Sequence, residues 1–83
     1  MELIETWDNP NGFSWLTIEK ERDTYFIFVG NKNGVRRELR KSRDLEYIQK
    51  SFDWQKDFAI RMNEAMKGVI EKLKNNHIVK GEN

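Results

Sequence analysis

The sequence has no cysteine, a single proline and a single histidine among its 83 residues. Without cysteine the fold cannot be held by disulfides, and thiolate metal sites and cysteine nucleophiles are excluded. The histidine, His77, has no second histidine or cysteine with which to share a metal ion. No apolar run approaches the roughly 20 residues of a membrane span, and the N-terminal residues lack the pattern of a signal peptide. We therefore expect a cytoplasmic protein that binds no metal and enters no membrane.

Groups suited to catalysis are also scarce. Asp53 and Asp57 are spaced one helical turn apart, and Glu19, Glu21 and Asp23 surround a predicted turn. Paired carboxylates perform acid–base catalysis when burial separates their pKa values, whereas these carboxylates lie among polar neighbours. The glycines do not form a phosphate-binding loop, and no Ser-His-Asp arrangement can be argued. We expect a protein that is not an enzyme and uses no cofactor.

The composition nevertheless predicts a folded chain. Hydrophobic residues make up 37% of the sequence and charged residues 35%, and five phenylalanines, three tryptophans and two tyrosines supply large apolar side chains. A chain of this length forms one domain with a thin core. We expect that domain to cover residues 1–76, followed by a flexible tail over residues 77–83.

Alternating hydrophobic residues and turn signals predict four strands. Their approximate ranges are 2–7, 13–19, 24–30 and 35–41. The continuous apolar run at residues 25–29 predicts a central strand that is buried on both faces. On the last strand, alternation places Arg36, Glu38 and Arg40 together on a polar face suited to a sheet edge.

The remaining pattern predicts one long helix, at about residues 43–75, with Ser42 as its N-cap. At 1.5 Å per residue this helix is roughly 50 Å long, and a break near Ser51–Asp53 stays open as an alternative. One apolar stripe, which includes Met62 and Met66, is predicted to lie in the core. A second apolar set lies off that stripe and includes Tyr47, Trp54, Phe58, Ile60 and Ile70.

Together these elements predict an α+β fold, in which a four-stranded antiparallel β-meander precedes one long C-terminal helix. The helix should cross one face of the sheet and extend past it. It is roughly 50 Å long, whereas a compact chain of this length has a radius of gyration of only about 12 Å. Apolar surface on such a helix requires a second molecule to cover it.

Basic residues gather between positions 32 and 43, where six basic side chains accompany one acidic side chain. The candidate binding residues in this cluster are Arg36, Arg37, Arg40, Lys41 and Arg43. Arginine side chains bind phosphates and carboxylates through paired hydrogen bonds. The alternative interpretation is a charged edge strand that prevents aggregation between sheets.

Three functions are consistent with these features. The first is a non-enzymatic binding module of the bacterial or phage accessory type, which regulates or inhibits a macromolecular partner, most simply a protein, and works as a homodimer. Its candidate contact residues on the helix are Tyr47, Trp54 and Phe58. The second is a nucleic-acid-binding protein that uses the basic edge strand and the sheet aromatics. The third is sequestration of a small phosphorylated ligand by the arginines.

Overall fold

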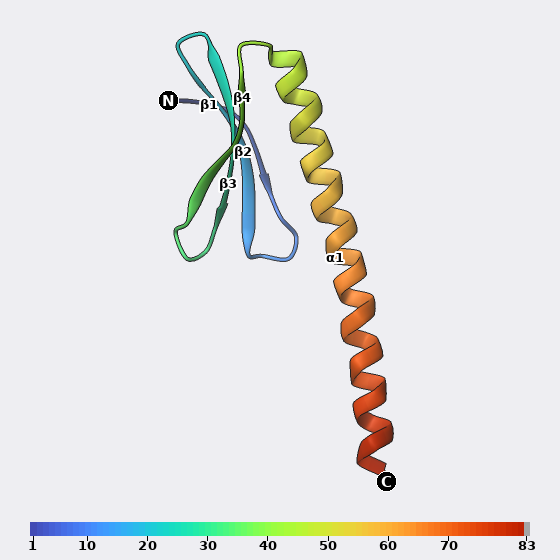
Figure 1. Cartoon of the computed structure of the whole chain (residues 1–83). Coiled ribbons are helices and arrows are strands. Elements are labelled where there is room, and N and C mark those ends of the chain that lie inside the picture. Colours follow the sequence, from blue (N-terminus) through green and yellow to red (C-terminus); the bar gives the residue numbers. More distant parts are fainter. Residues whose placement is uncertain (83) are drawn as a thin grey trace.

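A computed structural model of the protein describes the backbone of residues 1–82 and the side chains of residues 1–73. Its elements are β1 (Glu2–Asp8), β2 (Ser14–Glu21), β3 (Thr24–Asn31), β4 (Arg36–Ser42) and α1 (Leu45–Glu82). The strands form one antiparallel sheet in the order β1-β2-β3-β4, and α1 lies along one face and runs far past its end (Figure 1). The predicted α+β meander with a long C-terminal helix is confirmed.

Asparagine and glycine close the first and last hairpins of the sheet. Between β1 and β2 the side-chain carbonyl of Asn9 accepts a hydrogen bond from the backbone N–H of Asn11 at 3.0 Å, and Gly12 has a φ of 78°. Between β3 and β4 the Asn31 side chain makes the equivalent bonds, and Gly34 has a φ of 83°. These side chains favour turns because they satisfy nearby backbone donors, and glycine tolerates the left-handed conformation.

The start of α1 differs from the prediction by two residues. Asp44, not Ser42, is the N-cap, because its carboxylate accepts a hydrogen bond from the backbone N–H of Tyr47 at 3.2 Å. Ser42 ends β4, and its hydroxyl accepts a hydrogen bond from the Asp44 N–H at 3.0 Å. The helix then continues through Ser51–Asp53 without a break.

The helix α1 ends at Glu82, beyond the predicted end near residue 75. The predicted flexible tail, residues 77–83, and His77 lie outside the residues whose side chains are described. The tail therefore stays a prediction.

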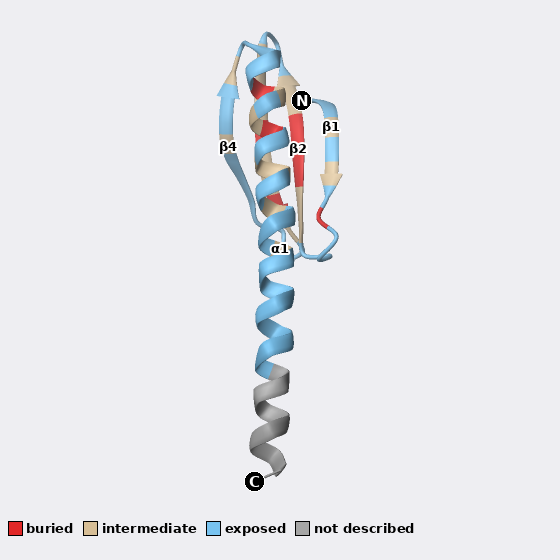
Figure 2. Cartoon of the chain, turned by 90° about the vertical axis from the view of Figure 1, so that its right-hand side faces the viewer, coloured by how far each residue is buried: buried red, intermediate tan, exposed pale blue. Residues whose placement is uncertain are grey.

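The core is small and lies between the sheet and the first third of α1. Its buried apolar members are Leu16 and Ile18 from β2, Ile27 from β3, and Ile48 and Phe52 from α1. Buried residues are gathered where the helix overlaps the sheet, and the helix below that overlap is exposed as far as residue 73 (Figure 2). Burial of one such side chain contributes about 1.5–3 kcal/mol, so a few residues carry much of the hydrophobic stabilisation.

Within the part of the chain that the structure describes, no helix lies over the second face of the sheet. Phe26 and Phe28 lie on this open face and are only half-buried, with their rings stacked at a centroid distance of 5.9 Å. Trp15 lies opposite Gly30, where a Cβ atom would overlap the indole ring. The prediction that β3 is buried on both faces is wrong, because α1 is the one helix among the described residues 1–82 and it covers one face.

An irregularity in β4 also changes the predicted arrangement of its side chains. Ile27 pairs with Arg40, whereas the next residue, Phe28, pairs with Glu38, so Leu39 is an extra residue in the strand. Such a bulge moves the residues after it to the other face of the sheet. Arg40 therefore lies on the helix side, and its predicted place on the polar outer face is wrong.

The helix parts from the sheet at Asn63. The Asn63 side-chain amide donates a hydrogen bond to the Asn9 side-chain carbonyl at 2.6 Å and accepts one from Asn11 at 3.3 Å. Met62 and Met66, predicted as core residues, are both exposed. Met66 follows Asn63 by three residues and lies past the end of the sheet, whereas Met62 lies on a side of the helix that the sheet does not cover. The molecule measures 64 × 24 × 15 Å and has a radius of gyration of 17.5 Å, well above the roughly 12 Å of a compact chain of this length.

Candidate interaction surface

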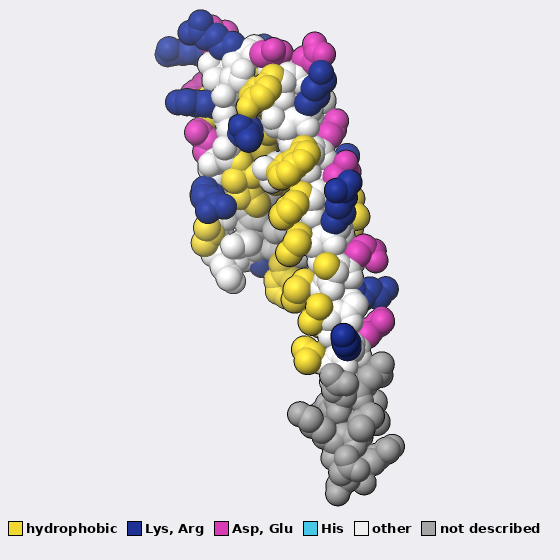
Figure 3. Space-filling view, turned by 45° about the vertical axis from the view of Figure 1, so that its right-hand side comes forward, with side chains coloured by type: hydrophobic (Ala, Val, Ile, Leu, Met, Phe, Trp, Pro, Cys, Tyr) yellow, Lys and Arg dark blue, Asp and Glu magenta, His cyan; other side chains and the backbone are white. Residues whose placement is uncertain are grey.

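One continuous row of uncharged residues follows α1 on a side that the sheet does not cover. We call it the free row, and its members are Tyr47, Ser51, Trp54, Phe58, Met62, Ala65 and Val69. They recur every three or four residues, so they share one side of the helix. Trp54 is 62% exposed and Phe58 is 50% exposed. Hydrophobic side chains run down the helix in a line that continues below the sheet (Figure 3).

The centre of the free row has a defined shape. The rings of Trp54 and Phe58 stack at a centroid distance of 5.5 Å with an angle of 12° between their planes. Together with Asp57 and Arg61 they line a hollow of about 90 Å³. These four residues are spaced i, i+3, i+4 and i+7, the arrangement that forms a hole for a side chain of a neighbouring helix in a coiled coil.

A second apolar hollow lies where α1 leaves the sheet. Phe13, at the β1–β2 turn, is among the most exposed aromatic side chains described, and it faces Met66 and Ile70 of the helix. The hollow that they line has a volume of about 480 Å³, and its polar edge is formed by Asn11, Asn63, Lys67 and Glu71. We call it the turn–helix hollow. It is open to solvent. It lies on a different side of the helix from the free row.

Several members of the predicted basic cluster are already paired with acidic or aromatic groups. Arg36 lies on the open face of the sheet, where its guanidinium contacts the Glu19 carboxylate at 2.5 Å and covers the Phe28 ring at 3.8 Å. Arg43 lies 3.5 Å from Asp23 at the end of the sheet, and both side chains are strongly exposed. These pairings reduce the net positive charge that the two arginines present to a ligand.

The other three candidate binding residues of the cluster do not share one face of the sheet. Arg40 lies on the helix side and donates a hydrogen bond to the Tyr47 hydroxyl at 2.8 Å. Arg37 pairs with Val29 in the register of the sheet, so it also belongs to the helix side, whereas Lys41 pairs with Phe26 on the open face. The sequence grouped these residues, and the structure divides them between the two faces of β4.

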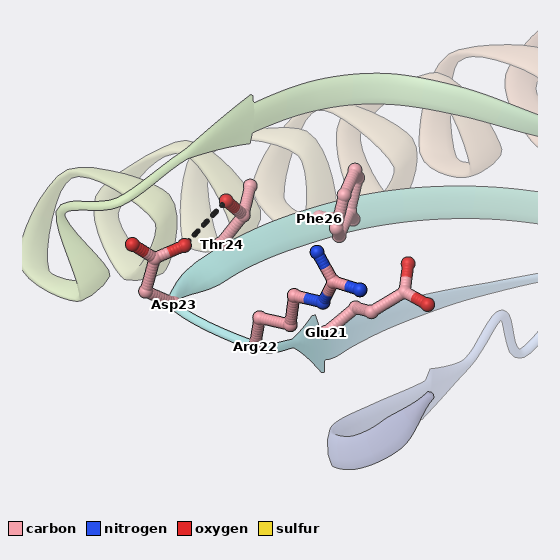
Figure 4. Close-up of a pocket in the computed structure, with 5 residues that line it drawn as sticks. All are labelled: Glu21, Arg22, Asp23, Thr24 and Phe26. Carbon is pink, nitrogen blue, oxygen red and sulfur yellow. Dashed lines mark hydrogen bonds between the residues drawn. The ribbon is translucent and has the colours of Figure 1, made fainter.

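A third hollow, of about 440 Å³, lies at the β2–β3 turn (Figure 4). It is lined by Glu21, Arg22, Asp23, Thr24 and Phe26, and the Thr24 hydroxyl donates a hydrogen bond to the Asp23 carboxylate at 3.3 Å. Two carboxylates accompany the one guanidinium. This charge balance does not favour a phosphate, which is best bound where positive charge is in excess.

The described side chains, residues 1–73, contain no group of three or more histidine, cysteine, aspartate or glutamate residues that could hold a metal ion. In the part of the chain that the structure describes, no helix is both long enough and apolar enough to cross a membrane. Comparison with known protein families, curated proteins and solved structures found no match for this chain. The surfaces themselves must therefore indicate the function.

Proposed function

We propose that the protein is a non-enzymatic binding module that works as a homodimer in the cytoplasm and regulates or inhibits a protein partner. One observation carries the proposal: α1 keeps apolar side chains exposed on two sides, along the free row and in the turn–helix hollow. A second copy that covers one side leaves the other available. The free row is assigned to the second copy, and the turn–helix hollow to the partner.

The energetic argument follows from the residues that are exposed. Burial of apolar surface contributes about 25 cal/mol per Å², and aromatic side chains supply most of the binding energy at protein interfaces. Trp54 and Phe58 are exposed at the middle of the helix, and Phe13 is exposed beside Ile70. Contiguous apolar surface of this kind on a soluble domain marks sites of interaction.

The turn–helix hollow suits a partner side chain because two elements form it. Phe13 stands on the β1–β2 turn, which the Asn9–Asn63 hydrogen bond fastens to the helix. The helix supplies Met66, a flexible side chain that adapts to irregular partners, and Ile70. Apolar walls with a few polar groups at the edge are typical of sites that bind a ligand or a projecting side chain.

Nucleic acid is the second candidate partner. The observation that favours it is the stacked Phe26–Phe28 pair on the open face of the sheet, since bases stack on exposed aromatic rings. Arg36 already covers Phe28, however, and is paired with Glu19. Binding that weakens steeply with added salt, and that is lost in Lys41→Glu on the same open face, would support this candidate over the first. The third prediction, a small phosphorylated ligand, gains no support from the divided arginines.

The proposal is tested by affinity capture from a nuclease-treated lysate of the source organism, with two matched variants. Ile70→Glu places a charge in the turn–helix hollow, and Ile60→Glu places the same charge outside both surfaces, at a similar exposure of 39% against 47%. The wild-type protein and Ile60→Glu should retain the same protein partner, and Ile70→Glu should lose it. A partner that is captured only when nuclease is left out, or that is captured equally by all three proteins, contradicts the proposal.

A further inference from the structure

We propose that the free row pairs with the free row of a second copy in antiparallel orientation, with the two-fold axis at Phe58. The inference rests on the homodimer of the proposed function and adds its interface, orientation and register. Isologous contacts of this kind need a surface that is complementary to itself. The free row has that property in three respects.

The first respect is the spacing of its residues. From Phe58 the row continues at intervals of four, three and four residues toward each end, so it reads the same in both directions. An antiparallel copy then brings Trp54 to Met62, Tyr47 to Val69 and Ser51 to Ala65. Large side chains meet large ones and small side chains meet small ones, which allows close packing along the row.

The second respect is the hollow at the centre. It is bounded by Trp54, Asp57, Phe58 and Arg61, whose mean position along the helix lies within one residue of Phe58. In the antiparallel register Phe58 of the second copy reaches the helix at this level. The same insertion occurs twice, once in each direction, as symmetry requires.

The third respect is charge. Asp57 and Arg61 lie along the same edge of the free row, and both line the central hollow. Antiparallel pairing places Arg61 beside Asp57 of the second copy, displaced by only two residues, or about 3 Å, along the axis. Opposite charges at the edge of an apolar seam favour one orientation over the other. In a parallel pair this edge would instead face the opposite edge of the second copy's row, and Asp57 would not meet Arg61.

The two edges of the sheet, β1 and β4, do not offer the same match. β1 has three acidic residues and no basic one, and β4 has Arg36, Arg37, Arg40 and Lys41 against the single acidic Glu38. Two copies of either edge strand side by side would bring like charges together, which destabilises strand pairing. The free row is therefore the surface that fits a second copy.

Disulfide trapping tests the register. Because the protein has no native cysteine, only the introduced cysteines can form disulfides. The double variant Ser51→Cys with Ala65→Cys should form a covalent dimer under mild oxidation, because each cysteine meets the other type on the second copy. Within one chain the two positions are about 21 Å apart along the helix, far beyond the roughly 4.4–6.8 Å between Cα atoms that a disulfide spans.

The two single variants are the matched controls. In the antiparallel register Ser51→Cys alone and Ala65→Cys alone should remain uncrosslinked, whereas a mixture of them should give a mixed disulfide dimer. Single variants that cross-link as readily as the double variant would show a parallel pair and overturn the proposal. Absence of any cross-link in folded double variant, checked by circular dichroism, overturns it as well. The experiment uses purified protein, so its outcome is independent of whether a partner is captured from lysate.

Discussion

Phe52 and Phe58 are the same residue type, six positions apart on one continuous helix, and their environments are opposite. Phe52 is fully buried against the sheet, with 0% of its surface exposed, whereas Phe58 is 50% exposed. Nothing in the residue itself accounts for the difference. What differs is the neighbour: the sheet covers one side of α1 down to Asn63, whereas the side that carries Phe58 is left open, apart from the contact of Arg40 with Tyr47 near its start.

The comparison separates two uses of apolar side chains in a small protein. The sheet-facing side of α1 supplies the core of the fold, and the free row supplies surface for association. Both patterns have helical spacing, so periodicity alone does not distinguish them. A sheet with one helix provides cover for one side of that helix only, and the second row must be explained by something outside the fold.

The largest expected effect is the contrast between Phe52→Ala and Phe58→Ala. Loss of a fully buried phenylalanine should lower the free energy of unfolding by about 3–5 kcal/mol, because it removes transfer energy and leaves a cavity. Phe58→Ala, measured at a dilution where the protein is monomeric, should change it by less than about 0.5 kcal/mol. Urea unfolding of both variants provides the measurement. Equal effects would mean that Phe58 belongs to the fold.

Gly30→Ala extends the comparison to the two faces of the sheet. The new Cβ atom would overlap the Trp15 indole, so one of them must move, at a cost of about 1–3 kcal/mol in unfolding free energy. In a Trp15→Ala background the same change should cost much less, because the obstructing ring is gone. Thermal unfolding of the four proteins in this cycle gives the coupling. A cost that is the same in both backgrounds would contradict the close packing.

Asn63→Ala tests where the fold ends and the projecting helix begins. Asn9 is buried, and the variant removes the 2.6 Å bond from Asn63 to its side-chain carbonyl, which keeps its bond from the Asn11 N–H. The expected cost is that of one lost hydrogen bond, about 0.5–1.5 kcal/mol. The neighbouring control Glu64→Ala, at an exposed position, should stay within about 0.5 kcal/mol. Hydrogen exchange should also quicken around the β1–β2 turn in Asn63→Ala alone. Unchanged hydrogen exchange at this turn would show that Asn63 does not hold the turn against the helix.

The smallest expected effect is at the two-residue β2–β3 turn. Arg22 has a φ of 59°, a conformation that a side chain disfavours. Arg22→Gly should therefore raise the free energy of unfolding slightly, by up to about 1 kcal/mol, and Arg22→Ala should leave it near the wild-type value. The denaturant midpoints of the two variants, compared with the midpoint of the wild type, measure these differences in stability. A glycine variant that is less stable than the alanine variant would contradict the reasoning.

The sequence predicted the elements well because their signals are local. Alternation, Asn-Gly turns and the long helical segment are each encoded by residues that are close together in the chain. The bulge at Leu39 was missed, because it depends on how β4 pairs with β3 and leaves no pattern within the strand itself. Asp44 could have been recognised as the cap, since aspartate is as good an N-cap as serine and stands directly before Leu45.

The candidate surface was predicted in part. Tyr47, Trp54 and Phe58 were recognised as lying off the core stripe, and the structure places all three on the free row. The exposure of Met66 could not be predicted, because it depends on where the sheet stops beside the helix. The Asn9–Asn63 contact joins residues 54 positions apart. No signal within either segment indicates that contact.

The central claim is that the free row is covered by another copy, and the mass of the protein in solution tests it most directly. Light scattering over a range of concentrations should give a mass that rises to twice the 10.0 kDa of one chain. Phe58→Glu should stay at the mass of one chain, and Ile60→Glu, which carries the same charge outside the row, should behave as the wild type does. A wild-type protein that keeps the mass of one chain at every concentration would contradict the account.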